Sequence, residues 1–78
     1  MKKYKFVHFT NERQALLLKD GCTYIASFSD RLLHPEVLVF PCDGEGKITD
    51  WSETDGGTGY ASIDEFLIEF TNYNPSEE

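Results

Sequence analysis

Hydrophobic and polar residues alternate along much of the N-terminal half of the chain. Residues 3–9 (KYKFVHF) place Tyr4, Phe6 and His8 on one side and the intervening residues on the other. Residues 23–28 (TYIASF) repeat the same two-residue period. Because successive side chains of a strand point to opposite faces of a sheet, both segments are predicted to be strands.

The leucine-rich segment 13–19 is compatible with a short helix or with a strand. A strand is favoured because Asp20 and Gly21 follow directly, and an Asp-Gly pair suits the positive φ angles of a tight hairpin turn. The segment would then pair with residues 23–28. A preceding turn is predicted at residues 10–12, where Thr, Asn and Glu follow one another.

The middle of the chain adds further strand signals. Residues 36–40 (EVLVF) are rich in β-branched and aromatic side chains, typical of a strand buried on both faces, and Pro41 should end it. Before it, Pro35 disfavours helix at His34, so residues 29–35 are predicted to form a turn or one loose helical turn. After a turn at residues 43–47, residues 48–51 are expected to pair back as a short final strand.

Residues 62–70 carry the pattern of an amphipathic helix. Ser62 and Glu65 have the spacing of a capping box, in which each side chain bonds a backbone N–H at the helix start. An apolar stripe follows at helical spacing, formed by Ile63, Phe66, Leu67 and Phe70. The acidic residues of this segment are predicted to face water, and the glycines at positions 56, 57 and 59 to form a flexible connection leading into the helix.

These elements predict an α+β fold with a four- to five-stranded, mostly antiparallel sheet and one C-terminal helix packed on a face. Residues 1–72 should form a single domain, followed by a frayed acidic tail at residues 73–78. With 78 residues, 40% of them hydrophobic and 14% aromatic, the chain is too rich in large apolar side chains for a disordered segment. No apolar run approaches the roughly 20 residues needed to span a bilayer, and the alternating N-terminus does not resemble a signal peptide. We expect a cytoplasmic protein.

The formal charge of −7 is distributed unevenly along the chain. Residues 1–35 hold six basic and three acidic side chains, whereas residues 36–78 hold one lysine and eleven carboxylates. This field repels phosphate backbones, which disfavours direct binding of nucleic acid and favours a protein partner with a basic surface. Acidity that serves solubility alone is the alternative.

Residue patterns for covalent, metal or phosphate chemistry are incomplete. Cys22 and Cys42 lack zinc-ligand spacing and are expected to be reduced and partly buried, with a cross-strand disulfide as the alternative. The glycine-rich segment lacks a phosphate-loop motif, and residues 43–50 depart from a calcium loop. Cys42 with His8 or His34 is the nucleophile–base combination that remains, and its geometry is undefined by sequence. We therefore predict no cofactor, no metal and no catalytic residue, which favours a non-enzymatic protein.

The segment DWSETDGGTGY, together with the helix, is the predicted partner-binding surface. Tryptophan is enriched at interface centres, so Trp51 would act as an aromatic anchor within an acidic rim. The full set of predicted partner-binding residues is Asp50, Trp51, Glu53, Asp55, Tyr60, Asp64, Glu65 and Glu69. In the alternative, Trp51 lies in the core beneath the helix, as a single tryptophan in a small domain commonly does.

Two segments, LVFPCDGEGKITDWSE and SIDEFLIEF, resemble in type the small acidic accessory proteins of phages and other mobile elements. The resemblance covers mainly residues 37–70. That type includes anti-CRISPR proteins and other inhibitors of host defence, some of which resemble DNA in their charge distribution. The resemblance implies an inhibitor that occupies a basic, nucleic-acid-binding groove of a host protein. The alternative is a structural domain that forms a homodimer by pairing the edge strand at residues 3–9.

Overall fold

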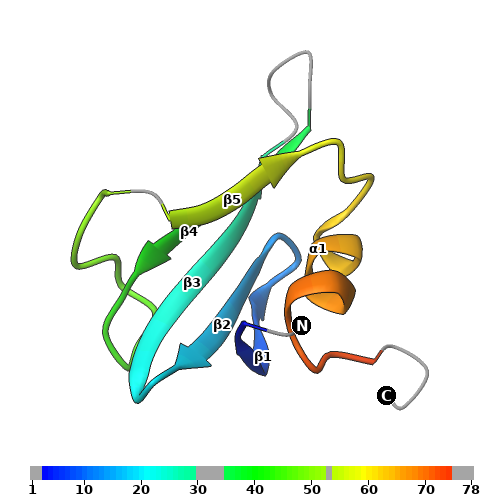
Figure 1. Cartoon of the computed structure of the whole chain (residues 1–78). Coiled ribbons are helices and arrows are strands. Elements are labelled where there is room, and N and C mark those ends of the chain that lie inside the picture. The colour runs from blue at the N-terminus through cyan, green and yellow to red at the C-terminus, as the bar shows by residue number, and fades with distance from the viewer. Residues whose placement is uncertain (1–2, 30–34, 53, 75–78) are drawn as a thin grey trace.

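The computed structural model describes residues 3–29, 35–52 and 54–74. Five strands form one antiparallel sheet in which each strand pairs with its neighbours in sequence, and one helix follows (Figure 1). The elements are β1 (Lys5–Asn11), β2 (Gln14–Lys19), β3 (Cys22–Ser29), β4 (Glu36–Pro41), β5 (Thr54–Thr58) and α1 (Ile63–Phe70). The predicted α+β fold is thus confirmed. Within the described ranges, no helix has the length and apolar character needed to cross a membrane.

The hairpin between β2 and β3 forms as its turn residues predict. Asp20 and Gly21 have φ angles of 53° and 79°, so both adopt the left-handed conformation that a two-residue type I′ turn requires. Lys19 pairs with Cys22 across this turn. The leucine-rich segment, whose sequence is compatible with a helix or a strand, therefore forms a strand. Within it, Leu16 and Leu17 are buried on opposite faces of the sheet.

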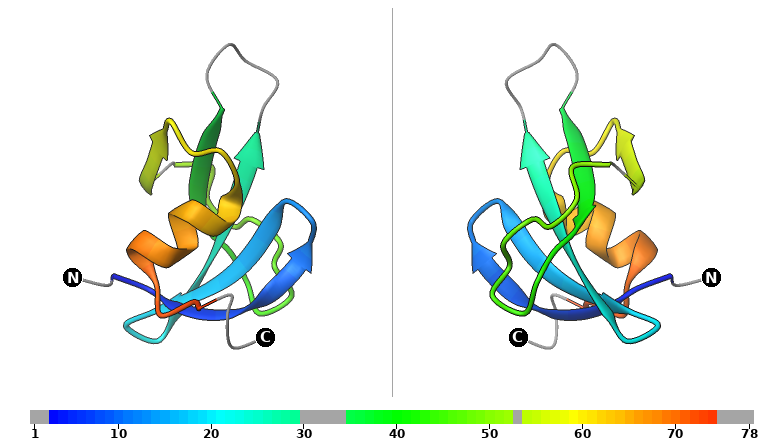
Figure 2. Two further views of the ribbon diagram at one scale, coloured as in Figure 1. Left: turned by 90° about the vertical axis from the view of Figure 1, so that its right-hand side faces the viewer. Right: turned by 90° about the vertical axis from the view of Figure 1, so that its left-hand side faces the viewer.

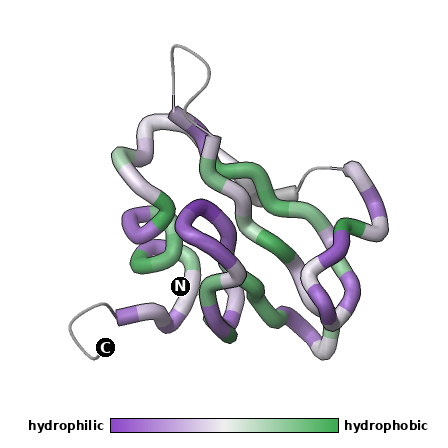
Figure 3. The backbone as a smooth tube through the Cα atoms, turned by 180° about the vertical axis from the view of Figure 1, so that it is seen from behind, coloured by the Kyte–Doolittle hydropathy of each residue, from purple (hydrophilic) through white to green (hydrophobic). Residues whose placement is uncertain are grey.

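Alternation along the strands gives the sheet two different faces. We call the side that α1 covers the helix face and the opposite side the open face (Figure 2). The core on the helix face consists of Tyr4, Ala15, Leu17, Ala26, Val37, Val39, Ile63, Phe66, Leu67 and Tyr73. A smaller cluster on the open face consists of Leu16, Ile25, Phe40 and Cys42. Hydrophobic positions follow the strands (Figure 3). β4 is buried on the helix face through Val37 and Val39, whereas on the open face Phe40 is buried and Leu38 is half-buried, so the predicted burial on both faces holds only in part.

The fifth strand differs from the prediction. Residues 48–51 do not form a strand, and Ile48 makes an isolated bridge to Cys42. β5 instead contains Gly56 and Gly57, two of the three glycines predicted to form a flexible connection, and Gly59 follows the strand with a φ angle of 88°. The reason is that β4 leaves a row of unpaired backbone groups, and Val37 and Gly57 become cross-strand partners there. A Cβ atom added at Gly57 would come within 3.2 Å of the Tyr60 ring, so glycine allows that ring to cover the strand.

β1 begins later than predicted and is irregular. The backbone N–H groups of Lys3 and Tyr4 both donate to the carbonyl of Phe70, at 3.0 Å, instead of entering the sheet. A register shift follows between Phe6, which pairs with Leu17, and His8, which pairs with Leu16. The predicted alternation is therefore broken: Phe6 packs on the helix face, whereas His8 lies in register with a residue of the open face.

The helix starts and ends through different side-chain contacts from those expected. Ser62 caps α1 without a side-chain hydrogen bond, and Glu65 accepts from the N–H of Ala61 at 3.1 Å, so half of the capping box forms, one residue earlier. After α1, Tyr73 is only 8% exposed and packs among aromatic rings of β1. The core therefore extends to a residue that the prediction placed in the tail. Residues 75–78, and most of the turn predicted at 29–35, lie outside the described residues.

Candidate functional site

The structure divides the predicted partner-binding residues between the two faces of the sheet. Asp50 and Trp51 lie in the segment after Ile48, and the Trp51 ring contacts Phe40 of the open face, with centroids 5.4 Å apart. Tyr60 contacts Phe66 on the helix face, at 5.5 Å. The acids of α1, which are Asp64, Glu65 and Glu69, belong to the helix side. Glu53 lies outside the described residues, and for Asp55 only the backbone, within β5, is described.

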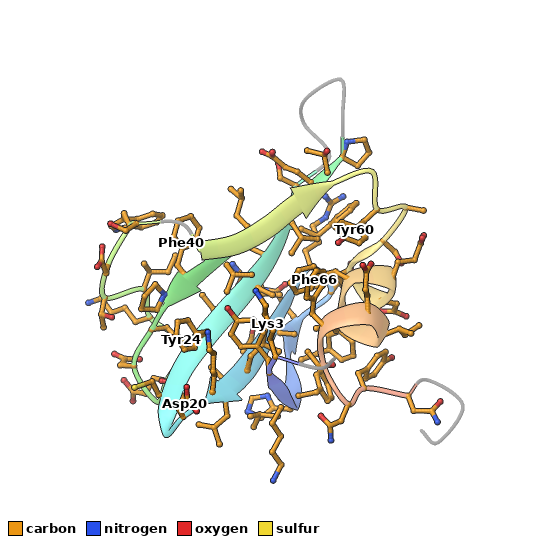
Figure 4. All side chains as sticks on the ribbon, in the orientation of Figure 1. Lys3, Asp20, Tyr24, Phe40, Tyr60 and Phe66 are labelled. Atoms are coloured by element: carbon orange, nitrogen blue, oxygen red, sulfur yellow. The ribbon has the colours of Figure 1, made fainter. Side chains whose placement is uncertain are left out.

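Trp51 does not lie in the core beneath the helix. Its side chain is 75% exposed, and it leans on Phe40 at an interplanar angle of 59°. Figure 4 shows Phe40 on β4, away from α1, whereas Phe66 lies on α1 and Tyr60 lies near it. The burial alternative is therefore wrong, and Trp51 presents a large exposed aromatic surface supported by an apolar floor.

Trp51 borders a hollow of about 450 Å³ on the open face. The hollow is lined by Gln14, Ser27, Ser29, Glu36, Leu38, Phe40, Ile48 and Trp51. Its floor is largely apolar, its polar groups come from β2 and β3, and a carboxylate stands on β4. A volume of this order, with an apolar floor and few polar groups, is typical of binding clefts, which measure about 300–1,000 Å³.

Hydrogen bonds within the chain shape the segment that carries Trp51. The Asp43 carboxylate accepts from the N–H groups of Lys47 and Glu45, at 3.0 and 2.9 Å, and these bonds lower the pKa of Asp43. The Asp50 carboxylate accepts from the N–H of Ser52 at 2.9 Å, and backbone and side-chain bonds from Ser52 lower its pKa as well. Both carboxylates are therefore ionised at neutral pH, which places negative charge on the segment that leads to Trp51.

On the helix side, Tyr60 belongs to the framework that joins β5 to α1. Burial raises the pKa of Tyr60, and the neighbouring charge of Glu69, which also accepts the hydrogen bond of the Tyr60 hydroxyl, raises it further. A shallower hollow of about 470 Å³ lies between the β1–β2 turn and α1, and carries the carboxylates of Glu12 and Asp64. The aromatic residues of this hollow, Phe9 and Tyr73, are partly or fully buried, so among the described residues that line it none presents an exposed ring like that of Trp51.

The cysteines lie on different faces and are both free thiols. Cys22 is exposed, contrary to the expectation of partial burial, whereas Cys42 is buried and backbone-paired with Thr23. Burial raises the pKa of Cys42, the Thr23 hydrogen bond opposes that shift, and Asp43 adds to it. A raised pKa keeps the thiol protonated, unlike an activated nucleophile. His8 is exposed on β1, and His34 lies outside the described residues.

Over the described parts of the chain, no group of three or more His, Cys, Asp or Glu side chains is placed to hold a metal ion. Asp43 instead uses its carboxylate to organise the 43–47 turn.

The hollow contains residues that the sequence analysis did not single out. Glu36, Leu38 and Phe40 occupy alternate positions of β4, so the sequence pattern alone places them on a common face. Which face that is depends on where α1 and Trp51 lie, and those positions are set by tertiary contacts. Comparison with protein-family models, curated proteins and solved structures finds no match to this chain.

Proposed function

We propose that this protein is a non-enzymatic binding module that holds a partner protein on the open face, around Trp51. The observation that carries the proposal is the 75% exposure of Trp51, which leans on Phe40 beside a hollow of about 450 Å³. Large aromatic side chains in this setting are the residues that contribute most to protein–protein affinity. The proposed binding site thus keeps Trp51 as the anchor of the predicted surface and leaves out the acids of α1, which lie on the other side of the sheet.

Charge supports a basic partner. The chain carries a net charge of −7, and the ionised carboxylates of Asp43 and Asp50 lie on the segment that bears Trp51. Such a field accelerates encounter with a positively charged surface and weakens the binding of acidic proteins and nucleic acids. The acids of α1 add to the long-range field without touching the open face.

The resemblance to phage accessory proteins extends this proposal to a biological role. The partner would be a host protein whose basic groove normally binds nucleic acid, and the chain would inhibit that protein by occupying the groove. This role predicts that binding weakens strongly with added salt, because contacts between opposite charges are screened.

The test compares two variants of exposed hydrophobic residues on opposite sides of the sheet. Trp51→Ala should reduce capture of a host protein from lysate by about thirtyfold, the effect of losing an interface residue worth ~2 kcal/mol. Ile68→Ala is the matched control, because Ile68 is 44% exposed on α1. Capture is measured with the tagged protein at low and high salt, and bound proteins are identified by mass spectrometry.

The result that contradicts the proposal is equally specific. If the Trp51→Ala variant retains the proteins captured by the wild-type chain, or if Ile68→Ala loses them to the same extent, the open face is not the binding site. Circular dichroism of both variants shows whether each is folded. A loss of capture counts only for a variant with the wild-type spectrum.

A further inference from the structure

Three side chains of different character line the open-face hollow in sequence along β4. Glu36, Leu38 and Phe40 succeed one another at alternate positions, so neighbouring members are roughly 6.6 Å apart along the strand. The carboxylate stands at one end, and the Phe40–Trp51 pair at the other. The hollow therefore offers a negative site, an aliphatic site and an aromatic site in a line.

We propose, on the basis of the binding function above, that this line receives an extended segment of the partner with alternating arginine and apolar side chains. An extended segment projects every second side chain to one side, also at roughly 6.6 Å intervals, which matches the spacing along β4. An arginine pairs with Glu36, the next inward-facing side chain packs on Leu38, and the following one lies against Phe40 and Trp51. A second arginine at that last position gains a cation–π contact with the exposed indole.

The polar lining of the hollow fits this ligand. Ser29 is the cross-strand partner of Glu36, so its hydroxyl lies beside the carboxylate and adds an acceptor for a guanidinium group. Ser27 is the partner of Leu38, and Gln14 is the partner of Ser27, so both border the aliphatic site. The side-chain oxygen Oε1 of Gln14 already accepts from the Asn11 amide at 2.8 Å, which leaves the side-chain NH₂ group of Gln14 to donate to a carbonyl of the bound segment.

Other occupants fit less well. A second copy of this chain brings the same net charge of −7 and is repelled by the first. A nucleic acid strand would bring its phosphates toward Glu36 and Asp50. A basic, partly apolar segment is complementary to the negative charge of Glu36 and to the apolar floor of the hollow.

The experiment uses the intrinsic fluorescence of Trp51, the sole tryptophan of the chain. The probe is a seven-residue peptide, capped at both ends, with arginine, leucine and arginine at its second, fourth and sixth positions and threonine elsewhere. We expect a saturable change in Trp51 emission. A peptide with glutamate in place of both arginines should cause none, and one with asparagine in place of leucine should bind more weakly.

Two charge-neutralising variants then locate the contact. Glu36→Gln should weaken peptide binding by about tenfold or more, because a charge-assisted hydrogen bond to arginine is lost. Glu12→Gln removes the same charge on the helix side, where Glu12 borders the other hollow, and should leave the affinity within about twofold. Equal affinities of the two variants would overturn the inference, as would the absence of any saturable change with the wild-type protein.

The outcomes separate this inference from the proposed function. If Glu36→Gln behaves like Glu12→Gln while capture of the partner still depends on Trp51, the open face binds a partner, but not in this orientation. If capture is independent of Trp51, the proposed function itself fails.

Discussion

At the scale of single residues, Thr71 stands out because its polar side chain is fully buried; among the described residues it is the buried polar one. Its hydroxyl donates to the carbonyl of Leu67 at 2.5 Å and accepts from the N–H of Tyr73 at 2.9 Å. The Leu67 carbonyl also accepts from the backbone N–H of Thr71, so Thr71 gives this carbonyl in the last turn of α1 two donors and its hydroxyl holds the chain as it turns back toward the sheet. Tyr73 then reaches the rings of Phe6 and Phe9, at 4.8 and 5.4 Å.

The prediction at this scale concerns the hydroxyl of Thr71. Thr71→Val keeps the shape of the side chain and removes the hydroxyl, so the buried hydrogen bond from the N–H of Tyr73 to this hydroxyl is lost. The free energy of unfolding should fall by about 1–3 kcal/mol. Urea denaturation followed by circular dichroism measures this change, with Thr71→Ser as the control that retains both hydrogen bonds. An unchanged urea midpoint for Thr71→Val would show that the hydroxyl has no such role.

At the scale of elements, the β2–β3 hairpin has a turn in which both residues, Asp20 and Gly21, adopt positive φ angles. Gly21 has a φ angle of 79°, and apart from Gly21 and its two chain neighbours no residue has a heavy atom within 4 Å of the position that its Cβ would occupy. A substitution there tests backbone strain without a steric clash. Gly44, in the 43–47 turn, has equally open surroundings but is not among the glycines with a positive φ angle.

Gly21→Ala and Gly44→Ala should therefore differ. Gly21→Ala should lower the free energy of unfolding by about 1–2 kcal/mol, because an L-residue is forced into the left-handed region. Gly44→Ala should change it by less than about 0.5 kcal/mol. Thermal or urea unfolding of the two variants in parallel decides the point. Equal stabilities would mean that the turn relaxes to another conformation when Gly21 is replaced.

At the scale of the whole molecule, charge and the closure of the first sheet edge both act against self-association. The N–H of Phe6 donates to the side chain of Asn72 at 2.8 Å, and the residues before it bond to Phe70. Part of the β1 edge, which the dimer hypothesis needs for pairing, is thus occupied by the chain that follows α1. Native sheets commonly protect their edges in this way.

We therefore expect a monomer at neutral pH and low salt, where each copy carries −7. Near the isoelectric point of about 4.6 this repulsion disappears, and association should increase. Sedimentation velocity at several protein concentrations, at both pH values, measures the effect. A concentration-dependent dimer at neutral pH would favour the homo-oligomer hypothesis over the monomeric binding module.

Features that depend on neighbouring residues could be predicted from the sequence alone. The Asp20-Gly21 turn follows from the φ angles that these two residues tolerate, and the helix follows from an apolar stripe that repeats within two turns. The sequence also shows Trp51 among acidic residues, which made it a candidate anchor for a partner. In each case the physical cause lies within a few residues of the feature itself.

Features that depend on distant residues were decided by the tertiary structure. The glycines of β5 have little intrinsic preference for a strand and become one because β4 needs a partner. The irregularity of β1 follows from hydrogen bonds to Phe70 and Asn72, more than sixty residues away. The acids predicted as one surface separate because the segment that carries Trp51 packs on the open face, whereas α1 packs on the other. Sequence alone determined the elements and the candidate anchor; only packing across the sheet decided which residues share a face, because that choice depends on contacts between segments far apart in the chain.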